Sequence, residues 1–351
     1  MSAPLEHQPA GPIALGLDTF GDVTHGPDGR PQHHAAVLRE VVEQAVLADQ
    51  VGVDAIGLGE HHRDDFAITA PDVVLAAIAG KTERILLGSA VTVLSSDDPI
   101  RVFERFSTID AISHGRAEVT LGRGSFTESF PLFGFDLADY EVLFNEKLDL
   151  FSRILTEEPV TWSGTTRPPL TEQRIFPPTE NGLKVWIGVG GSPQSIVRAA
   201  HYRLPLMLAI IGGAPEQFVP FVRYYRELLE AAGTTQLPVG MHSPGYVADT
   251  DEQARDELYD HFQSNRARIG GERGWAPPTR IEFERAASPE GALYVGSPET
   301  VARKIARNVQ ALGATRFDLK YANGPMPHAQ LLRCIELYGT QVKPLVLDML
   351  A

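Results

Sequence analysis

Short apolar runs alternate with longer amphipathic segments eight times along this chain of 351 residues. An apolar run of this length is typical of a strand buried on both faces, whereas apolar residues three and four positions apart predict a helix. Strands that alternate with helices form parallel sheets through right-handed crossovers, so eight such units predict a (β/α)8 barrel. The predicted strands cover residues 13–20, 54–59, 85–94, 116–122, 184–190, 204–211, 238–248 and 316–322.

Three of the predicted helices begin with a clear signal. An Asp or Ser directly before a proline suits a helix start, because its side chain accepts a backbone N–H and the proline already has a helical φ. The pairs are Asp98–Pro99, Ser192–Pro193 and Ser297–Pro298. The helices that follow the eight strands are predicted near 35–51, 70–80, 99–112, 139–155, 193–202, 215–232, 251–268 and 327–347.

No repeat and no linker divides the sequence, so residues 13–351 are expected to form one barrel domain after a loose tail at 1–12. Segment 264–292 interrupts the alternation, since it is rich in Gly and Pro and carries five arginines. It follows the seventh strand, at the barrel face where active sites are built. We expect a long inserted loop that acts as a lid; a surface excursion without a role is the alternative.

The composition argues against several classes of partner and location. Asp and Glu number 45 against 31 Lys and Arg, which gives a net charge of −14. Nucleic acids and anionic membranes attract basic surfaces, so neither is an expected partner. The single cysteine, Cys334, cannot form an internal disulfide and is expected to be a buried thiol. No apolar run reaches the roughly 20 residues of a membrane helix, and the first residues do not resemble a signal peptide. A cytoplasmic location is expected.

Two adjacent histidines follow the second predicted strand in the stretch GEHHRDDF. Glu60, His61 and His62 therefore lie where a barrel builds its active site. A metal site needs three or four suitably spaced ligands, and the His-x-His and His-x3-His spacings are absent here, so no metal is expected. A neutral imidazole at this place suits acid–base catalysis near pH 7, and Glu60 is a candidate to orient one ring. The alternative is that the histidines only hydrogen-bond a neighbouring loop.

Two glycine-containing segments are candidates for binding a phosphate. In GVGGSPQS, Gly190 and Gly191 let the backbone approach an anion, while Ser192 and Ser195 stand at a helix start whose N–H groups favour negative charge. In LGRG, Arg123 ends the fourth strand and can bind a phosphate through two hydrogen bonds. Each segment alone also fits a simpler explanation, namely helix capping for the serines and a surface ion pair for the arginine.

Together these blocks resemble the bacterial luciferase-like family of flavin-dependent monooxygenases. The blocks GEHHRDDF, LLGSAVTVLSSDDPIRVFERFSTIDAISHGR, LGRGSFTESFPLFGFD and VWIGVGGSPQSIVRAA match in order over roughly residues 13–248, and VGSPETVARKI extends the match. The resemblance implies a barrel that binds reduced FMN from a separate flavin reductase and acts with O2 on a small organic substrate. Light emission is not expected.

The resemblance also implies roles for particular residues. The family's acid–base histidine corresponds to His61 and a supporting histidine to His62. A non-prolyl cis peptide under the flavin ring corresponds to Ala90–Val91. Phosphate contacts correspond to Arg123, Ser192 and Ser195, with Gly190 and Gly191 forming the turn before Ser192.

The sequence departs from the light-emitting members at three positions. Their second phosphate arginine is Glu141 here, their reactive cysteine is Gly122, and an aromatic residue near the flavin ring is Ile210. The acidic residue at 141 weakens the predicted phosphate site unless an arginine of the lid compensates. The other two replacements alter the substrate pocket.

Three other functions remain open at this stage. A deazaflavin coenzyme on the same barrel would transfer hydride without oxygen, and a flavin-storing or flavin-sensing protein would keep the phosphate site without a catalytic base. A metal-dependent hydrolase would use His61, His62 and nearby carboxylates. Relatives commonly pair through the helices near 70–80 and 99–112, so a homodimer is expected.

Overall fold

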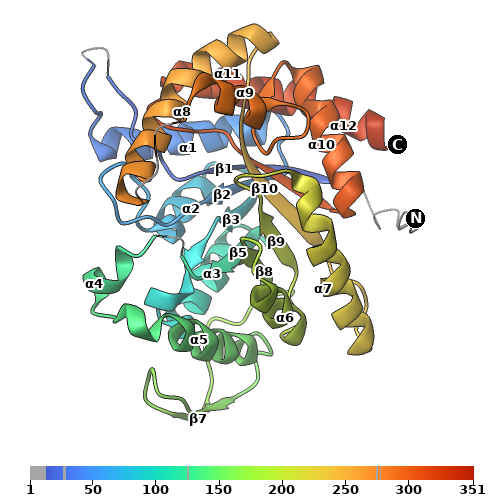
Figure 1. Cartoon of the computed structure of the whole chain (residues 1–351). Coiled ribbons are helices and arrows are strands. Elements are labelled where there is room, and N and C mark those ends of the chain that lie inside the picture. The colour runs from blue at the N-terminus through green and yellow to red at the C-terminus, as the bar shows by residue number, and fades with distance from the viewer. Residues whose placement is uncertain (1–12, 27–28, 125, 274–275, 277) are drawn as a thin grey trace. The chain divides into compact units, whose positions relative to one another are not determined.

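The computed structural model describes residues 13–26, 29–124, 126–273, 276 and 278–351 (Figure 1). The predicted tail at 1–12 lies outside this range. By internal contacts the chain divides into two compact units. One comprises Asp18–Gly188, and the other combines the chain up to Leu17 with Val189–Ala351.

Eight parallel strands, each followed by at least one helix, confirm the predicted (β/α)8 fold (Figure 1). Their ends lie within two or three residues of the predicted ones, apart from the third strand. The strands are β1 (Ala14–Thr19), β2 (Ala55–Leu58), β3 (Leu86–Ser89), β5 (Ala117–Gly122), β8 (Lys184–Val189), β9 (Leu206–Ala209), β10 (Val239–Val247) and β12 (Arg316–Lys320). The helices after them are α1 (His34–Gln50), α2 (Pro71–Ala79), α3 (Pro99–Ile112), α5 (Tyr140–Ile154), α6 (Pro193–His201), α7 (Val219–Ala231), α8 (Asp251–Arg273), α11 (His328–Leu337) and α12 (Lys343–Leu350).

In the unit Asp18–Gly188, the parallel strands pair in the order β2, β3, β5 and β8. Most of their side chains are buried, as apolar runs predict. Leu87, Val119 and Leu121 have no exposed surface, whereas every second residue of β8 is buried. The predicted strand 85–94 is interrupted, because β3 ends at Ser89 and a short strand, β4 (Thr92–Val93), continues beside β5. The peptide bond between them, Ala90–Val91, is cis.

In the other unit, β10 pairs with β9 on one side and with β12 on the other. The far end of β10 also pairs with β11 (Tyr294–Gly296), which the sequence did not predict. Helix α10 (Pro298–Leu312) follows β11 and begins at the predicted Ser297 cap, whose Oγ accepts the N–H of Thr300 at 3.4 Å.

The insertion after β10 is mainly helical, although a loop was expected there. Helix α8 continues to Arg273, and α9 covers Arg280–Ala287. A capping box fixes the start of α9, since the Thr279 and Glu282 side chains each bond the other's backbone N–H. Arg280 of α9 also pairs with Asp256 of α8 at 3.3 Å. The role of the insertion as a lid remains a proposal.

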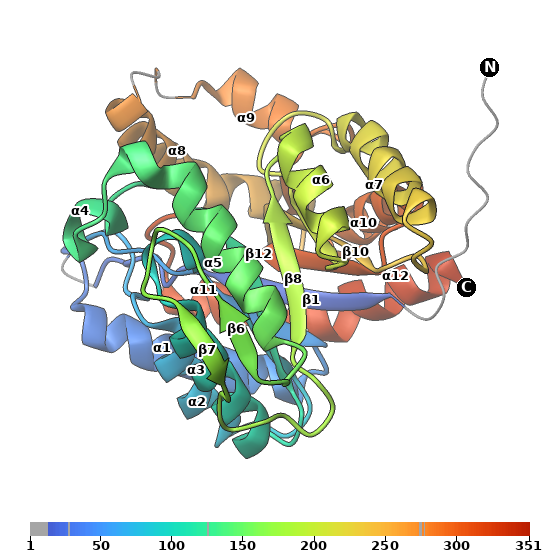
Figure 2. The same ribbon diagram turned by 90° about the horizontal axis from the view of Figure 1, so that it is seen from below.

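A hairpin of two antiparallel strands, β6 (Val160–Trp162) and β7 (Leu170–Gln173), precedes β8 and lies against α5 (Figure 2). The indole N–H of its buried Trp162 donates to Asp149 of α5 at 2.8 Å. A last short helix, α4 (Ser129–Phe133), lies between β5 and α5. No helix in the described residues is both long and apolar enough to cross a membrane. Cys334 is buried, as expected.

A buried arginine at the start of β5 joins three segments of the unit Asp18–Gly188. The Arg116 side chain donates to the carbonyl oxygens of Ala79, Thr82, Ile85 and Ser113 and to the Thr82 hydroxyl, at 2.9 to 3.1 Å. Only 9% of the residue is exposed. These carbonyls lie at or just beyond the ends of α2 and α3 and before β3, where backbone groups lack partners within their own element.

Candidate active site

Three phenylalanine rings enclose His61 in the loop after β2. The ring centroids of Phe20, Phe66 and Phe126 lie 4.6, 4.7 and 5.1 Å from the imidazole centroid. The His61 N–H donates to the carbonyl of Ile68 at 3.0 Å, and only 9% of the residue is exposed. The surrounding rings fix the orientation of the imidazole and limit its contact with water.

The carboxylate that faces the His61 imidazole belongs to Glu128, directly before α4. Glu128 Oε1 lies 3.7 Å from His61 Nδ1, within ion-pair distance. Burial raises the pKa of Glu128, but hydrogen bonds from His61 and from backbone N–H groups outweigh it and hold the pKa below the usual value. A carboxylate on this side favours a proton on Nδ1 and leaves Nε2 as the nitrogen that can exchange one.

Glu60, the residue considered for orienting a histidine, contacts His62. Its Oε1 lies 2.9 Å from His62 Nε2, and its Oε2 accepts the N–H of Val93 at 2.9 Å. The Phe133 ring meets the His62 ring edge-on, with centroids 4.9 Å apart. Glu60 therefore orients His62 and joins the end of β2 to β4, while Glu128 is the acidic neighbour of His61.

The backbone at Ala90–Val91 lies between the ends of neighbouring strands. The Ala90 N–H donates to the Leu58 carbonyl at 2.8 Å, and the Val91 carbonyl accepts the N–H of Glu60 at 3.2 Å. A Cβ atom on Gly122 would lie 2.5 Å from the Val91 side chain, closer than packed carbon atoms approach. A cysteine at this position would therefore collide with Val91, which fits the replacement of the reactive cysteine of the light-emitting members by Gly122.

Arg123, the predicted phosphate ligand at the end of β5, forms an ion pair with Glu141 of α5. Its guanidinium also lies over the Tyr140 ring, 5.5 Å from the centroid. The Tyr140 hydroxyl in turn donates to the Gly124 carbonyl at 2.8 Å. Glu141, which replaces the second phosphate arginine, thus competes with any phosphate for Arg123.

Apart from its first glycine, the segment GVGGSPQS lies in the unit that includes Val189–Ala351. Ser192 caps α6 by accepting the N–H of Ser195 at 3.3 Å, and the two hydroxyl groups are 2.8 Å apart. Gly191 has a φ of +102°, which disfavours other residues. A Cβ on Gly190 would meet no described atom within 4 Å. An open glycine backbone next to a helix start and two hydroxyls fits a phosphate group.

The predicted site residues are thus divided between the two units. The unit Asp18–Gly188 contains His61, His62, Ala90, Val91 and Arg123, and the other contains Gly190, Gly191, Ser192 and Ser195. Among the residues that the structure describes, no three or more His, Cys, Asp and Glu side chains are grouped to hold a metal ion.

The model of the luciferase-like monooxygenase family matches residues 20–316. The chain belongs to this family. A related 4-hydroxyprotoasukamycin monooxygenase from Streptomyces nodosus subsp. asukaensis is 29% identical over 239 residues, which are 64% of this chain and 63% of that protein. The match spans between about a third and just under two thirds of the length of the curated relatives.

Solved structures of luciferase-like enzymes share the fold over nearly the whole chain. Monooxygenase RslO1 from Streptomyces bottropensis has a TM-score of 0.81 at 24% identity, covering 95% of this chain and 99% of that one. The oxygenating constituent of 3,6-diketocamphane monooxygenase from Pseudomonas putida, in complex with FMN, has a TM-score of 0.76 at 18% identity and the same coverage. An F420-dependent secondary alcohol dehydrogenase has a TM-score of 0.72 at 17% identity, covering 96% and 99%.

Proposed function

We propose that this protein is an FMN-dependent monooxygenase, which uses reduced FMN and O2 to oxidise a small organic molecule. The observation that carries the proposal is the pair of His61, in the loop after β2, and Glu128, directly before α4, whose Nδ1 and Oε1 atoms are 3.7 Å apart. A flavin-storing protein has no need of a histidine oriented by a carboxylate. Family membership and the FMN-bound structural neighbour support the same choice.

His61 is the proposed acid–base residue of the reaction. Glu128 favours a proton on Nδ1, so Nε2 gives or takes the proton. The rings of Phe20, Phe66 and Phe126 restrict water around the imidazole and hold it in one orientation. Reduced FMN, when bound, supplies the electrons with which O2 is activated. His62, fixed by Glu60, supports the loop that carries His61.

The residues that would hold FMN are those at the strand ends and at the start of α6. The backbone of Ala90 and Val91 offers a surface for the flavin ring, and the Val91 side chain packs tightly against Gly122. The proposed phosphate contacts are Arg123, Gly190, Gly191, Ser192 and Ser195.

An anaerobic titration with reduced FMN and with reduced F420, followed by mixing with oxygen, tests the cofactor and the reaction class. We expect tighter binding of reduced FMN, and oxygen consumption that forms oxygenated product once substrates are screened with a flavin reductase present. Tighter F420 binding without oxygen use would replace the proposal by hydride transfer, a reading that the F420-dependent neighbour supports. FMN binding without turnover of any screened substrate would favour a binding protein.

The substitution Glu141→Gln is expected to tighten the binding of FMN by about two- to fivefold, because it releases Arg123 from a partly exposed ion pair worth at most about 1 kcal/mol. Riboflavin, which lacks the phosphate, serves as the control ligand, and its affinity should not change. Titration of the unaltered protein and of the Glu141→Gln variant with FMN and with riboflavin, at two salt concentrations, measures the effect. Equal tightening for riboflavin would show that residue 141 does not act through the phosphate.

A separate flavin reductase as the source of reduced FMN, a homodimer and a cytoplasmic location complete the proposal. Val73 of α2 and Ile112 of α3 are apolar side chains with 65% and 53% of their surface exposed. They support pairing of two chains through the helices that relatives use.

A further inference from the structure

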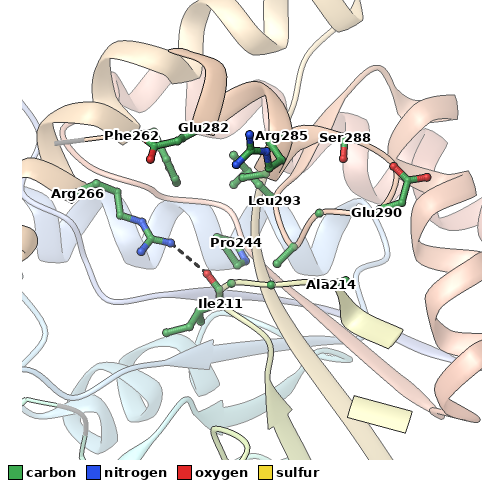
Figure 3. A pocket seen from close by; sticks show the side chains of 15 residues that line it. Ile211, Ala214, Pro244, Phe262, Arg266, Glu282, Arg285, Ser288, Glu290 and Leu293 are labelled. Carbon is green, nitrogen blue, oxygen red and sulfur yellow. Dashed lines mark hydrogen bonds between the residues drawn. The ribbon is translucent and has the colours of Figure 1, made fainter. Parts of the chain in front are cut away.

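A cavity of about 370 Å³ lies in the unit that carries the insertion (Figure 3). Its wall comes from the loop after β9, from β10, from α8 and α9, and from the segment that leads to β11. Ile211, Pro244, Phe262 and Leu293 contribute apolar side chains. A cavity of this size and lining is typical of sites for small organic ligands.

The wall formed by α9 is held in place by packing. The buried Phe283 ring lies 5.3 Å from the Tyr259 ring and 5.5 Å from the Phe262 ring of α8, measured between centroids. The buried Lys304 Nζ donates to the carbonyls of Ser288 and Leu293, at 2.6 and 2.8 Å, which fixes both ends of the segment after α9. The cavity therefore exists before any ligand enters.

Two arginines give the apolar cavity its polar character (Figure 3). The Arg266 guanidinium donates to the Ile211 carbonyl at 3.0 Å and lies over the Phe262 ring, 5.2 Å from the centroid. Within the described residues, the Arg285 guanidinium has no hydrogen bond and no carboxylate within ion-pair distance, although it attracts Glu282 electrostatically.

The two carboxylates of the lining are already engaged elsewhere. Glu282 accepts the N–H and the hydroxyl of Thr279 at 2.7 and 3.0 Å. Glu290 lies 3.6 Å from Arg307. The positive charge of Arg285 therefore remains available to a ligand, and its guanidinium matches the geometry of a carboxylate.

We propose that this cavity binds a flat organic anion of the aromatic carboxylate class. The apolar wall accommodates the ring system, and Arg285 binds the carboxylate. An inorganic anion would leave the apolar wall without contacts, and a neutral aromatic molecule would not use the guanidinium. All residues that line the cavity belong to one unit, and binding of the anion there does not require a flavin.

Calorimetric titration of the full chain with 2-naphthoate and with 2-naphthamide tests the proposal. We expect 2-naphthoate to bind about tenfold more tightly than 2-naphthamide. Arg285→Gln should remove this difference in affinity and leave the affinity for 2-naphthamide unchanged. Arg303→Gln, at an exposed arginine of α10 outside the cavity, is the matched control and should change neither affinity.

A second variant tests the place of binding independently of charge. Ile211 is 55% exposed, so Ile211→Trp narrows the cavity without disturbing the core and should weaken both probes at least about tenfold. Unfolding curves confirm that each variant is folded. Equal affinity for the two probes, no binding of 2-naphthoate, or unchanged 2-naphthoate affinity in the Arg285 or the Ile211 variant would overturn the proposal.

Discussion

Replacement of His61 by alanine is expected to lower turnover by about 10²- to 10⁴-fold, while the affinity for reduced FMN changes little. The imidazole is enclosed by three aromatic rings and faces Glu128, so its removal takes away the proposed proton carrier of the site. Steady-state turnover with a flavin reductase and an identified substrate gives the first quantity, and an anaerobic titration gives the second. Full turnover with normal flavin binding would remove His61 from the mechanism.

Two glutamate variants separate catalysis from support of the loop. Glu128→Gln should lower kcat about tenfold without changing KM, and ¹⁵N NMR should show a redistribution of the proton between the two ring nitrogens of His61. Glu60→Gln acts on His62 and on the Val93 N–H, so it should leave the His61 nitrogen signals unchanged. A shift of the His61 signals in the Glu60 variant alone would contradict the assignment of Glu128 as the positioning residue.

The substitution Arg116→Met is expected to lower the free energy of unfolding by about 3 kcal/mol or more, because several buried carbonyl oxygens lose a side-chain donor. Urea unfolding followed by circular dichroism measures the change. Arg101→Met is the matched control, since that side chain is 74% exposed and its ion pair is with Glu104 on the surface. This variant should cost less than about 1 kcal/mol. Equal losses in both variants would show that the hydrogen bonds of Arg116 do not stabilise the fold.

The sequence predicts those parts of the fold that depend on neighbours along the chain. The eight strands form where the sequence is rich in apolar residues and most side chains are buried, although charged and apolar residues alternate in β12. The caps at Asp98, Ser192 and Ser297 form because a side chain directly before a helix start meets the N–H groups two or three residues further along, without help from the rest of the fold.

Features that depend on distant residues were not predictable in this way. The apolar run 85–94 reads as one strand, but the chain changes course at Ala90–Val91 between β3 and β4. The hairpin β6–β7 is too short for its alternation to be distinctive. Gly and Pro suggested a loop for the insertion, yet α8 passes through Gly270 and Gly271 and ends at Arg273.

In the candidate site, too, the sequence predicts what depends on nearby residues and not what depends on distant ones. His61 was identifiable because it lies just beyond the end of a predicted strand, and residues at that place build the active site of a barrel. Glu128 was missed because it lies 67 positions after His61 in the sequence, and no motif connects residues so far apart. Glu60 was next in the sequence and was therefore considered, although the structure turns it toward His62.

The His61 enclosure and the cavity belong to different units of the chain. One of them can therefore be changed by recombination without changing the other. Every residue of the His61 enclosure lies between Phe20 and Glu128, whereas α8, α9 and the segment up to Leu293 supply most of the cavity wall in one continuous stretch. Exchange of residues 251–293 with the corresponding stretch of a relative would change the ligand preference of the cavity. The same exchange would leave every residue of the histidine enclosure unchanged.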